Sequence, residues 1–468
     1  MGSTFGILAL IPPIVAIALA FWKRQLLPSL FLGIWLGEAI IARGNAFSGF
    51  VASLDRALRV TRGPGNLEII VFSLLIGGLL ALIREAKGFQ GFIAWAERRR
   101  LSGRRPVFGL TFLIGLSVFI ENYSNILING STMRPLYDRL RISRERLGYF
   151  IHTTSINTVA LVVFNSWGAF YMSLLQTQGI GQPLKVIVAS VPLNFYCLAS
   201  LVVVAIVMAT GLTIGPMKAA ESRAGGGAGS AEEAPGAEPS ELASHFTALP
   251  ARAFHMIFPI AILLATVILS LYLTGHGHIS QGSGSASVLY GVVIAILALA
   301  GLLIGKRYFR PQALIDILFR GVAELLPVGL LLVLALSLGD LCKTLGTGTF
   351  LAGLAREHLP AAVLPALVFG LSCIISFATG TSYGTFAIMI PIGIPMAQAS
   401  GLPLPLMFAA CISGGVFGDN CSPISDTSIV TGMAARISVV DHTRTQIPYA
   451  LISASIALVF FLVAGLAL

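Results

Sequence analysis

The chain has 468 residues, of which 56% are apolar and only 11% are charged. Residues 195–213 and 288–305 carry no charge at all, and each run is long enough to cross a hydrocarbon core of about 30 Å as a helix. The net charge of +10 lies in short clusters between such runs. This distribution is typical of a positive-inside membrane protein and not of a nucleic-acid-binding face. The composition excludes a soluble protein.

The first half of the chain contains a predicted hairpin. Residues 5–22 lack a basic region before them and a cleavage site after them, so they are expected to be a retained span and not a signal peptide. Residues 84–105 hold seven Lys or Arg residues and residues 134–146 hold five, which predicts that both stretches are cytoplasmic. Residues 106–133 lie between them and are too few for two crossings, which need about 40 residues. We therefore predict a re-entrant hairpin with its polar tip at residues 121–125.

A segment in the middle of the chain breaks the membrane pattern. Residues 217–249 are rich in Gly, Ala, Ser, Glu and Pro and have too little apolar surface to fold, which predicts a flexible cytoplasmic linker. The expected division is a first transmembrane repeat over residues 1–213, a linker over 214–252 and a second, inverted repeat over 253–468.

The second half repeats the arrangement upside down. Residues 360–397 are apolar but broken by the polar stretch 379–383, and few charges flank them, so this hairpin is expected to enter from outside. The fold class predicted is an all-α polytopic membrane protein of two inverted repeats, with re-entrant hairpins and broken helices. Each half has five spans and one hairpin. One loop disagrees with this topology. It is predicted to lie on the outer side of the membrane, yet it carries four arginines: Arg43, Arg56, Arg59 and Arg62.

Short sequence matches between the halves support the repeat. Residues 75–79 can be aligned with residues 337–341, and residues 119–124 with residues 377–382. Each match is short, but the two agree in order, spacing and predicted inversion, as expected for an inverted repeat.

Acidic residues at membrane depth are the strongest functional candidates, because each costs about 2.5–3.5 kcal/mol to insert. Residues 414–427 contain Asp419 and Asp426 on either side of Pro423, and a proline inside an apolar run breaks the helix. Broken backbone in lipid is tolerated only where it lines a cavity or binds something. Such oxygen groups with one or two carboxylates suit a small hard cation, so sodium is expected at Asp419 and Asp426.

The full set of candidate ion- or substrate-binding residues comes from the two hairpin tips, the broken segment and one span. They are Asp419, Asp426, Asn420, Ser422, Pro423, Ser425, Thr427, Thr379, Gly380, Thr381, Ser382, Glu121, Asn122, Asn125 and Asp340. The alternative for Asp419 and Asp426 is a structural helix cap. For Asp340 it is a position at the outer interface beside Lys343.

The chain resembles the NhaC-type sodium/proton antiporter family. The resemblance rests on five stretches: residues 134–136, 142–145, 338–340, 378–385 and 418–427. It implies exchange of cytoplasmic sodium for external protons or, as in some relatives, sodium coupled to movement of an organic acid.

Two departures from the family pattern remove acids. Relatives usually carry two adjacent aspartates where this chain has Glu121 and Asn122, and another aspartate where it has His152 and Thr153. The resemblance therefore implies fewer protons per transport cycle.

The sequence thus predicts a secondary transporter of a prokaryotic inner membrane. An enzyme would need an activated nucleophile or a metal cluster, and a channel would need a continuous pore where two opposed hairpins are expected. A sodium/proton antiporter is the first interpretation, and a sodium- or proton-coupled carrier of a small organic acid or amino acid is the alternative. Beyond sodium and protons as transported or coupling ions we expect no cofactor and no nucleic acid. The expected partners are the lipid bilayer and possible organic solutes, and the oligomeric state is left open.

Overall fold

A computed structural model gives the structure of the chain. It describes residues 5–467 except 24, 64, 92–102, 120–121, 226–249, 279–281, 348–349, 351–352 and 354–359. Every regular element in the described residues is a helix. Seven of these helices are long and apolar enough to span a membrane, and three bent pairs bring the number to ten by length and composition.

The first half contains four candidate spans, a shorter apolar helix and a hairpin. The candidate spans are α4 (Asn66–Glu85), the broken pair α8 (Arg144–Leu161) and α9 (Ser166–Thr177), the bent pair α10 (Pro183–Ser190) and α11 (Phe195–Thr210), and α2 (Leu26–Ile41) taken together with the helix after it; α1 (Ile11–Lys23) is the shorter apolar helix. A further helix, α3 (Ala46–Thr61), follows α2 at an angle of 119°. The hairpin consists of α6 (Arg104–Ser117) and α7 (Asn122–Arg139).

The second half has the same order of elements. The spans are α13 (Phe254–Thr274), α14 (Gly284–Gly305), α16 (Leu326–Leu345), the broken pair α20 (Leu404–Cys421) and α21 (Asp426–Ala435), and α22 (Val439–Leu466). Helix α15 (Pro311–Glu324) follows α14, as α3 follows α2. The hairpin consists of α18 (Leu364–Thr379) and α19 (Ser382–Ser400), and α18 with the residues just before it is also long and apolar enough to span a membrane. The predicted fold class, with its two inverted repeats, hairpins and broken helices, is confirmed.

The hairpins and broken helices of the two halves correspond at a constant offset of 260 residues. Asn122 and Ser382 begin the second hairpin helices, and Ser166 and Asp426 begin the second parts of the broken helices. This pairing makes Tyr123 equivalent to Tyr383, whereas the sequence match at the hairpin tips paired Tyr123 with Thr381. The short sequence match was therefore displaced by two residues.

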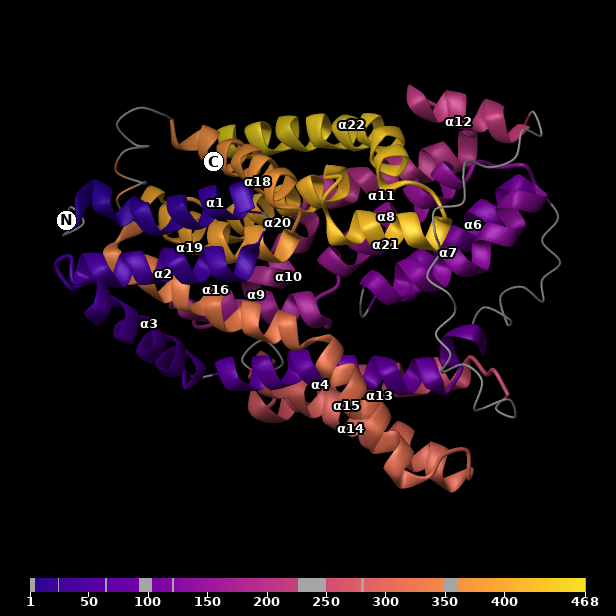
Figure 1. Ribbon diagram of the computed structural model, residues 1–468, viewed down its shortest axis with the longest axis horizontal. Helices are drawn as coiled ribbons and strands as arrows, with labels where there is room; N and C mark the ends of the chain where they lie inside the picture. The colour runs from indigo at the N-terminus through magenta and orange to yellow at the C-terminus, as the bar shows by residue number, and fades with distance from the viewer. Residues whose placement is uncertain are drawn as a thin grey trace.

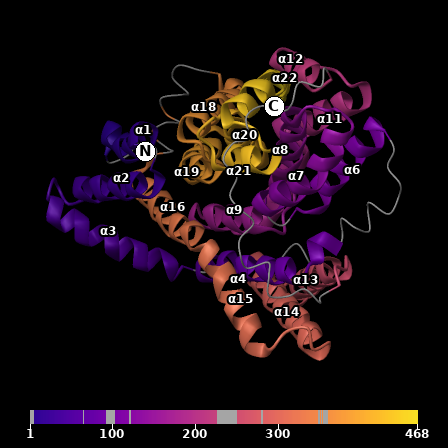
Figure 2. The ribbon, with the colours of Figure 1, turned by 45° about the vertical axis from the view of Figure 1, so that its right-hand side comes forward.

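The elements form two groups in space. The hairpins and broken helices pack with α11 and α22 in one bundle, while α4, α13, α14 and α15 lie together beside it (Figures 1 and 2). Helices α4 and α15 cross at Gly77 and Gly321, where a Cβ on either glycine would lie 2.3 Å from the carbonyl oxygen of the other. This crossing joins the two halves through direct backbone contact.

The four arginines that disagreed with the predicted topology flank or lie on α3. Arg43 lies in the turn before α3 and Arg62 just after it, while Arg56 is buried and pairs with Glu38 of α2 and Asp340 of α16. The positive-inside rule concerns loops, and here the basic residues belong to a packed amphipathic helix and its ends. This explains why the number of arginines in this segment does not predict on which side of the membrane the segment lies.

The beginning of the predicted linker differs from the expectation. Residues 216–225 form the helix α12 (Pro216–Gly225), with Met217 and Ala220 buried. Its Glu221 accepts hydrogen bonds from the backbone N–H (3.0 Å) and hydroxyl (2.6 Å) of Ser143. The start of this segment is therefore a packed helix, and residues 226–249 lie outside the described part of the chain.

Opposite labelling of the ends of the two hairpins is the expected consequence of the inversion. Arg139 near the end of α7 and Gln398 near the end of α19 are both exposed, and the five native cysteines are buried. A membrane-impermeant thiol reagent should label Arg139→Cys from the cytoplasmic side and Gln398→Cys from the outer side. Labelling of both positions from one side of intact cells would contradict the inverted arrangement.

Candidate functional site

Asp419 lies in the last turn of α20 and is surrounded by hydroxyl groups. Its side chain is buried. One carboxylate oxygen accepts a hydrogen bond from Ser382 (2.8 Å), and the other accepts from Thr427 (3.0 Å) and from Ser425. These hydroxyls come from the hairpin helix α19, from the break after α20 and from α21, so three elements must meet for the shell to form.

The local sequence explains why the helix stops beside Asp419. Ser422 still donates its N–H to Gly418 (2.9 Å), but Pro423 has no N–H to continue the ladder. Ser425 has extended backbone angles and precedes the new helix α21, which begins at Asp426. The break therefore places a helix C-terminus and a helix N-terminus next to each other.

The tip of the second hairpin packs directly on this break. Gly380 ends α18 with φ +67°, a conformation that favours glycine. A Cβ at Gly380 would lie 2.8 Å from the carbonyl oxygen of Ile424. Thr381 caps α19 by accepting the N–H of Gly384 (3.4 Å). The N-terminal turns of α19 and α21 thus each place a hydroxyl, that of Ser382 and that of Thr427, against the buried carboxylate of Asp419.

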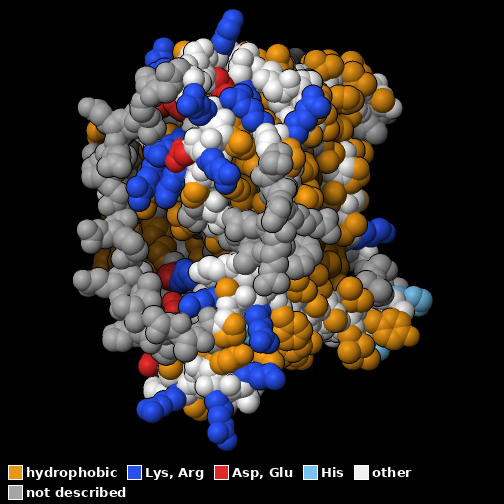
Figure 3. Space-filling view, turned by 90° about the vertical axis from the view of Figure 1, so that its right-hand side faces the viewer, with side chains coloured by type: hydrophobic (Ala, Val, Ile, Leu, Met, Phe, Trp, Pro, Cys, Tyr) orange, Lys and Arg blue, Asp and Glu red, His pale blue; other side chains and the backbone are white. Residues whose placement is uncertain are grey.

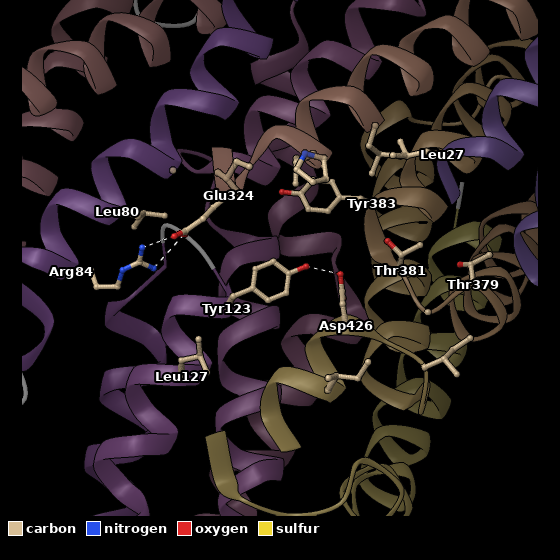
Figure 4. Close-up of a pocket in the computed structure, with 18 residues that line it drawn as sticks. Leu27, Leu80, Arg84, Tyr123, Leu127, Glu324, Thr379, Thr381, Tyr383 and Asp426 are labelled. Carbon is tan, nitrogen blue, oxygen red and sulfur yellow. Dashed lines mark hydrogen bonds and ion pairs between the residues drawn. The ribbon is translucent and has the colours of Figure 1, made fainter. Parts of the chain in front are cut away.

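Asp426 faces a cavity of about 590 Å³ that lies between the two halves (Figure 4). One carboxylate oxygen accepts the hydroxyl of Tyr123 (2.6 Å) from the first hairpin, and the other accepts the N–H of Thr427 (2.7 Å). Opposite them, Arg84 of α4 pairs with Glu324 of α15 at 2.7 Å. The remaining lining residues are Leu27, Gly77, Leu80, Leu127, Leu325, Pro327, Val328, Leu331, Thr379, Gly380, Thr381, Tyr383, Ile424 and Ile429.

Thr427 joins the two acids. Its N–H contacts Asp426, which is exposed to the cavity, and its hydroxyl contacts Asp419, which lies behind. A cation entering from the cavity would therefore meet Asp426 before Asp419. The available ligands are hard oxygen atoms of carboxylates and hydroxyls, which suit an alkali cation. Within the described residues, no group of three or more His, Cys, Asp or Glu side chains could hold a metal.

Other predicted site residues support the break without facing the cavity. Asn420 is buried, donates to the hydroxyl of Tyr196 (3.1 Å) and has its carbonyl bound by Gln446 (2.8 Å). The hydroxyl of Ser422 accepts the N–H of Ile424 (3.4 Å). Pro423 is exposed. Of the hairpin tip, Thr379 and Thr381 line the cavity.

Of the three candidate residues in the first hairpin, the structure describes Asn122 and Asn125. Asn122 and Asn125 are buried, and Asn125 donates to the carbonyls of Gly115 (2.7 Å) and Val118 (3.0 Å), which end α6. Asn125 therefore holds the hairpin together. Glu121 lies outside the described residues.

Asp340 lies apart from this site. It pairs with Arg56 and lines a separate cavity of about 210 Å³ with Arg59, Asn66 and Gln176. The structure does not bring Asp340 together with Asp419 or Asp426.

Two buried histidines extend the hydroxyl shell and were not among the predicted site residues. His152 of α8 contacts Thr427 through Nε2 (3.0 Å) and His442 of α22 through Nδ1 (2.8 Å). The sequence showed His152 only as a departure from the family pattern. Since 290 residues separate the two histidines along the chain, no local pattern could have paired them.

Comparisons with known proteins agree with this architecture. Residues 166–466 match the Na+/H+ antiporter family. An uncharacterized protein of Haemophilus influenzae is 28% identical over 98% of this chain and 90% of its own length. The malate-2H+/Na+-lactate antiporter of Bacillus subtilis is 30% identical, but over only 36% of each chain. The solved structure of the YdaH transporter of Alcanivorax borkumensis has a TM-score of 0.57 at 16% identity, covering 96% of this chain and 98% of that one, and shows a shared fold.

Replacement of Gly380 tests the contact between hairpin and break. In Gly380→Ala the new Cβ adds a clash with Ile424 to the left-handed strain of about 1–2 kcal/mol. Gly401→Ala is a matched control, because Gly401 also has a left-handed φ (+71°) but nothing within 4 Å. We expect Gly380→Ala to lower the thermal unfolding midpoint further than the control and to reduce transport by about tenfold or more. Equal behaviour of the two variants would mean that the contact is not required.

Proposed function

Because the chain belongs to the Na+/H+ antiporter family, a family of membrane transporters and not of enzymes, we propose that it exchanges sodium for protons across a prokaryotic inner membrane. The proposal rests on the buried Asp419, held by three hydroxyls at a helix break, with Asp426 between it and a cavity. The proposed arrangement keeps the halves at residues 1–213 and 253–468, joined on the cytoplasmic side.

Sodium and proton compete for the same carboxylate oxygens. Burial favours the neutral form of a carboxylic acid, whereas a bound cation favours the charged form. A site with one such acid therefore holds either a proton or sodium. Neither acid forms an ion pair with a Lys or Arg among the described residues, and the competition is sharpest at Asp419 because Asp419 is buried whereas Asp426 is exposed to the cavity.

Competition becomes exchange if the empty site cannot reorient. An uncompensated carboxylate at membrane depth is costly, so the charged, empty state is held back. The protonated and sodium-bound states carry no such penalty and can change their side of access. No separate proton pathway is needed in this scheme.

The size of the cavity favours a second candidate function. A volume of about 590 Å³ exceeds what a sodium ion needs, and the Arg84–Glu324 pair gives the wall both signs of charge. These groups could bind a small organic acid or amino acid, and the similar Bacillus subtilis protein is named for malate and lactate. Reconstituted vesicles with an internal pH dye separate the two candidates. Sodium-driven proton movement in the absence of any organic solute supports the sodium/proton antiporter. Accumulation of an organic solute in vesicles that show no sodium-driven proton movement supports the organic-solute carrier.

Removal of either carboxylate should abolish cation coupling. Asp419→Asn and Asp426→Asn keep the side-chain shape but delete the charge. We expect each to reduce sodium-driven proton movement by at least about tenfold, the effect of losing a charged hydrogen-bonding partner. Asp316→Asn is the control, because Asp316 is exposed on α15 and bonds only with neighbours on its own helix. Normal exchange by well-folded Asp419→Asn and Asp426→Asn proteins would remove these acids from the mechanism.

Restoring the missing family acids should change the proton count. Asn122 and Thr153 are both buried, so Asn122→Asp and Thr153→Asp add carboxylates that favour the protonated form. We expect a higher ratio of protons to sodium, measured from the gradients at which net exchange stops. Asn45→Asp serves as a control, because Asn45 is an exposed helix cap where aspartate is also favourable. An unchanged ratio in all three variants would show that these positions do not set the stoichiometry.

A further inference from the structure

A third cavity lies at the face formed by the ends of α6, α8, α11 and α12, here called the basic face. Its volume is about 470 Å³, and its lining contains four cationic side chains and one acid: Arg104, Arg105, Arg146, Lys218 and Glu221. Lys and Arg side chains gather over this part of the surface, next to hydrophobic ones (Figure 3). We propose that this cavity binds the phosphate headgroup of an anionic phospholipid.

Among the described residues, too few acids line the cavity to balance its positive charge. Glu221 is already engaged with Ser143, with Arg146 at 3.3 Å and with Arg104 at 3.8 Å. The side chains of Arg105 and Lys218 are exposed and form no ion pair or hydrogen bond with the described residues. An anion in the cavity would therefore meet two cations that no acid has neutralised.

The guanidinium of Arg146 is a buried cationic part of the cavity lining. Only 3% of its side chain is exposed, yet its hydrogen bond to the carbonyl of Gly211 is long (3.3 Å) and its Nε makes no hydrogen bond. Its guanidinium also lies over the ring of Phe108, 5.7 Å from the centroid. A buried guanidinium is stable only when its donors are well paired, so a phosphate would complete its environment.

The position of α11 favours a lipid over a free anion. Residues 208–211 at the end of α11 line the cavity. Leu198, Val202 and Ile206 are exposed at successive turns of the same helix and lie on the face that leads to Ala209 and Thr210. An acyl chain can follow this apolar stripe while the headgroup occupies the cavity. Basic pockets between spanning helices on the cytoplasmic side bind anionic headgroups in this way.

The proposed lipid would contact both the hairpin and the broken helix of the first half. Arg104 and Arg105 begin the hairpin helix α6, and Arg146 lies in the first turn of the broken helix α8. Occupancy of the cavity would therefore hold the hairpin and the broken helix to α12.

Thermal unfolding of the full-length protein in detergent tests the proposal. Phosphatidylglycerol, phosphatidylcholine and inorganic phosphate are titrated separately onto the wild type and onto the double variant Arg105→Gln/Lys218→Gln. The matched control is Lys306→Gln/Arg310→Gln, which removes two exposed cations from the α14–α15 connection. All three proteins should unfold at similar temperatures in phosphatidylcholine, since none of these side chains is buried.

We expect phosphatidylglycerol to raise the unfolding midpoint of the wild type and the control more than phosphatidylcholine does. In Arg105→Gln/Lys218→Gln the half-saturating concentration should rise by about tenfold or more, given roughly 1 kcal/mol for each basic residue near an anionic surface. Equal shifts in the two double variants would overturn the proposal, because the effect would then be general surface charge. Equal stabilisation by inorganic phosphate would overturn the choice of a lipid and assign the cavity to a soluble anion. Neither test depends on which ion or solute the protein transports.

Discussion

The hydroxyl shell around Asp419 is the interaction on which the arrangement of the second half depends. A charged or neutral carboxyl group in a membrane protein must find its partners within the protein, because lipid offers none. Ser382, Ser425 and Thr427 supply them from three different elements. For the shell to close, α18 and α20 must both end near Asp419, and the hairpin tip must contact the break. Gly380 permits that contact, since any side chain there would meet Ile424. The broken helices and hairpin are thus one structural unit.

The symmetry of the fold is not matched by symmetry of the chemistry. At the offset of 260 residues, Val159 corresponds to Asp419 and Ser166 to Asp426. The contact of Tyr383 with Ser166 (3.3 Å) therefore repeats that of Tyr123 with Asp426 (2.6 Å), but without a carboxylate. The first half instead contributes Tyr123 and His152 to the acids of the second. If the proposed site is made from the acids of one half and the donors of the other, its geometry changes whenever the halves move relative to each other.

Much of this site could be predicted from sequence because the membrane makes local patterns informative. Pro423, Asp419 and Asp426 in an apolar run signal a break, and the short stretch before Met133 signals a hairpin, since both violate what a simple span requires. The features that the sequence did not predict depend on tertiary contacts. The role of Arg56 as a partner of Asp340 depends on the bend after α2, and the packing of α12 depends on Glu221 reaching Ser143. Neither is encoded in composition or periodicity.

The histidines show how the shell around Asp419 could change on cation binding. The amide nitrogen of Gln446 donates to the carbonyl of Asn420 (2.8 Å), which fixes the amide orientation, and also lies 3.2 Å from Nδ1 of His152. In the tautomer in which Nδ1 accepts from Gln446 and from Nε2 of His442 (2.8 Å), Nε2 of His152 carries the proton and donates it to the hydroxyl oxygen of Thr427. Thr427 keeps one hydrogen, which it can give to Asp419 (3.0 Å) or to Ser425 (2.7 Å). Ser382 has a similar choice, because the carbonyl of Gly415 lies 3.2 Å from its hydroxyl.

In the proposed exchange, the hydroxyls of Thr427 and Ser382 donate their hydrogens to Asp419 when sodium is absent. When sodium binds and needs the lone pairs of the carboxylate, Thr427 donates to Ser425 and Ser382 donates to the carbonyl of Gly415. His152 restricts Thr427 to those two states, so the shell can switch between them without leaving a buried polar group unpaired.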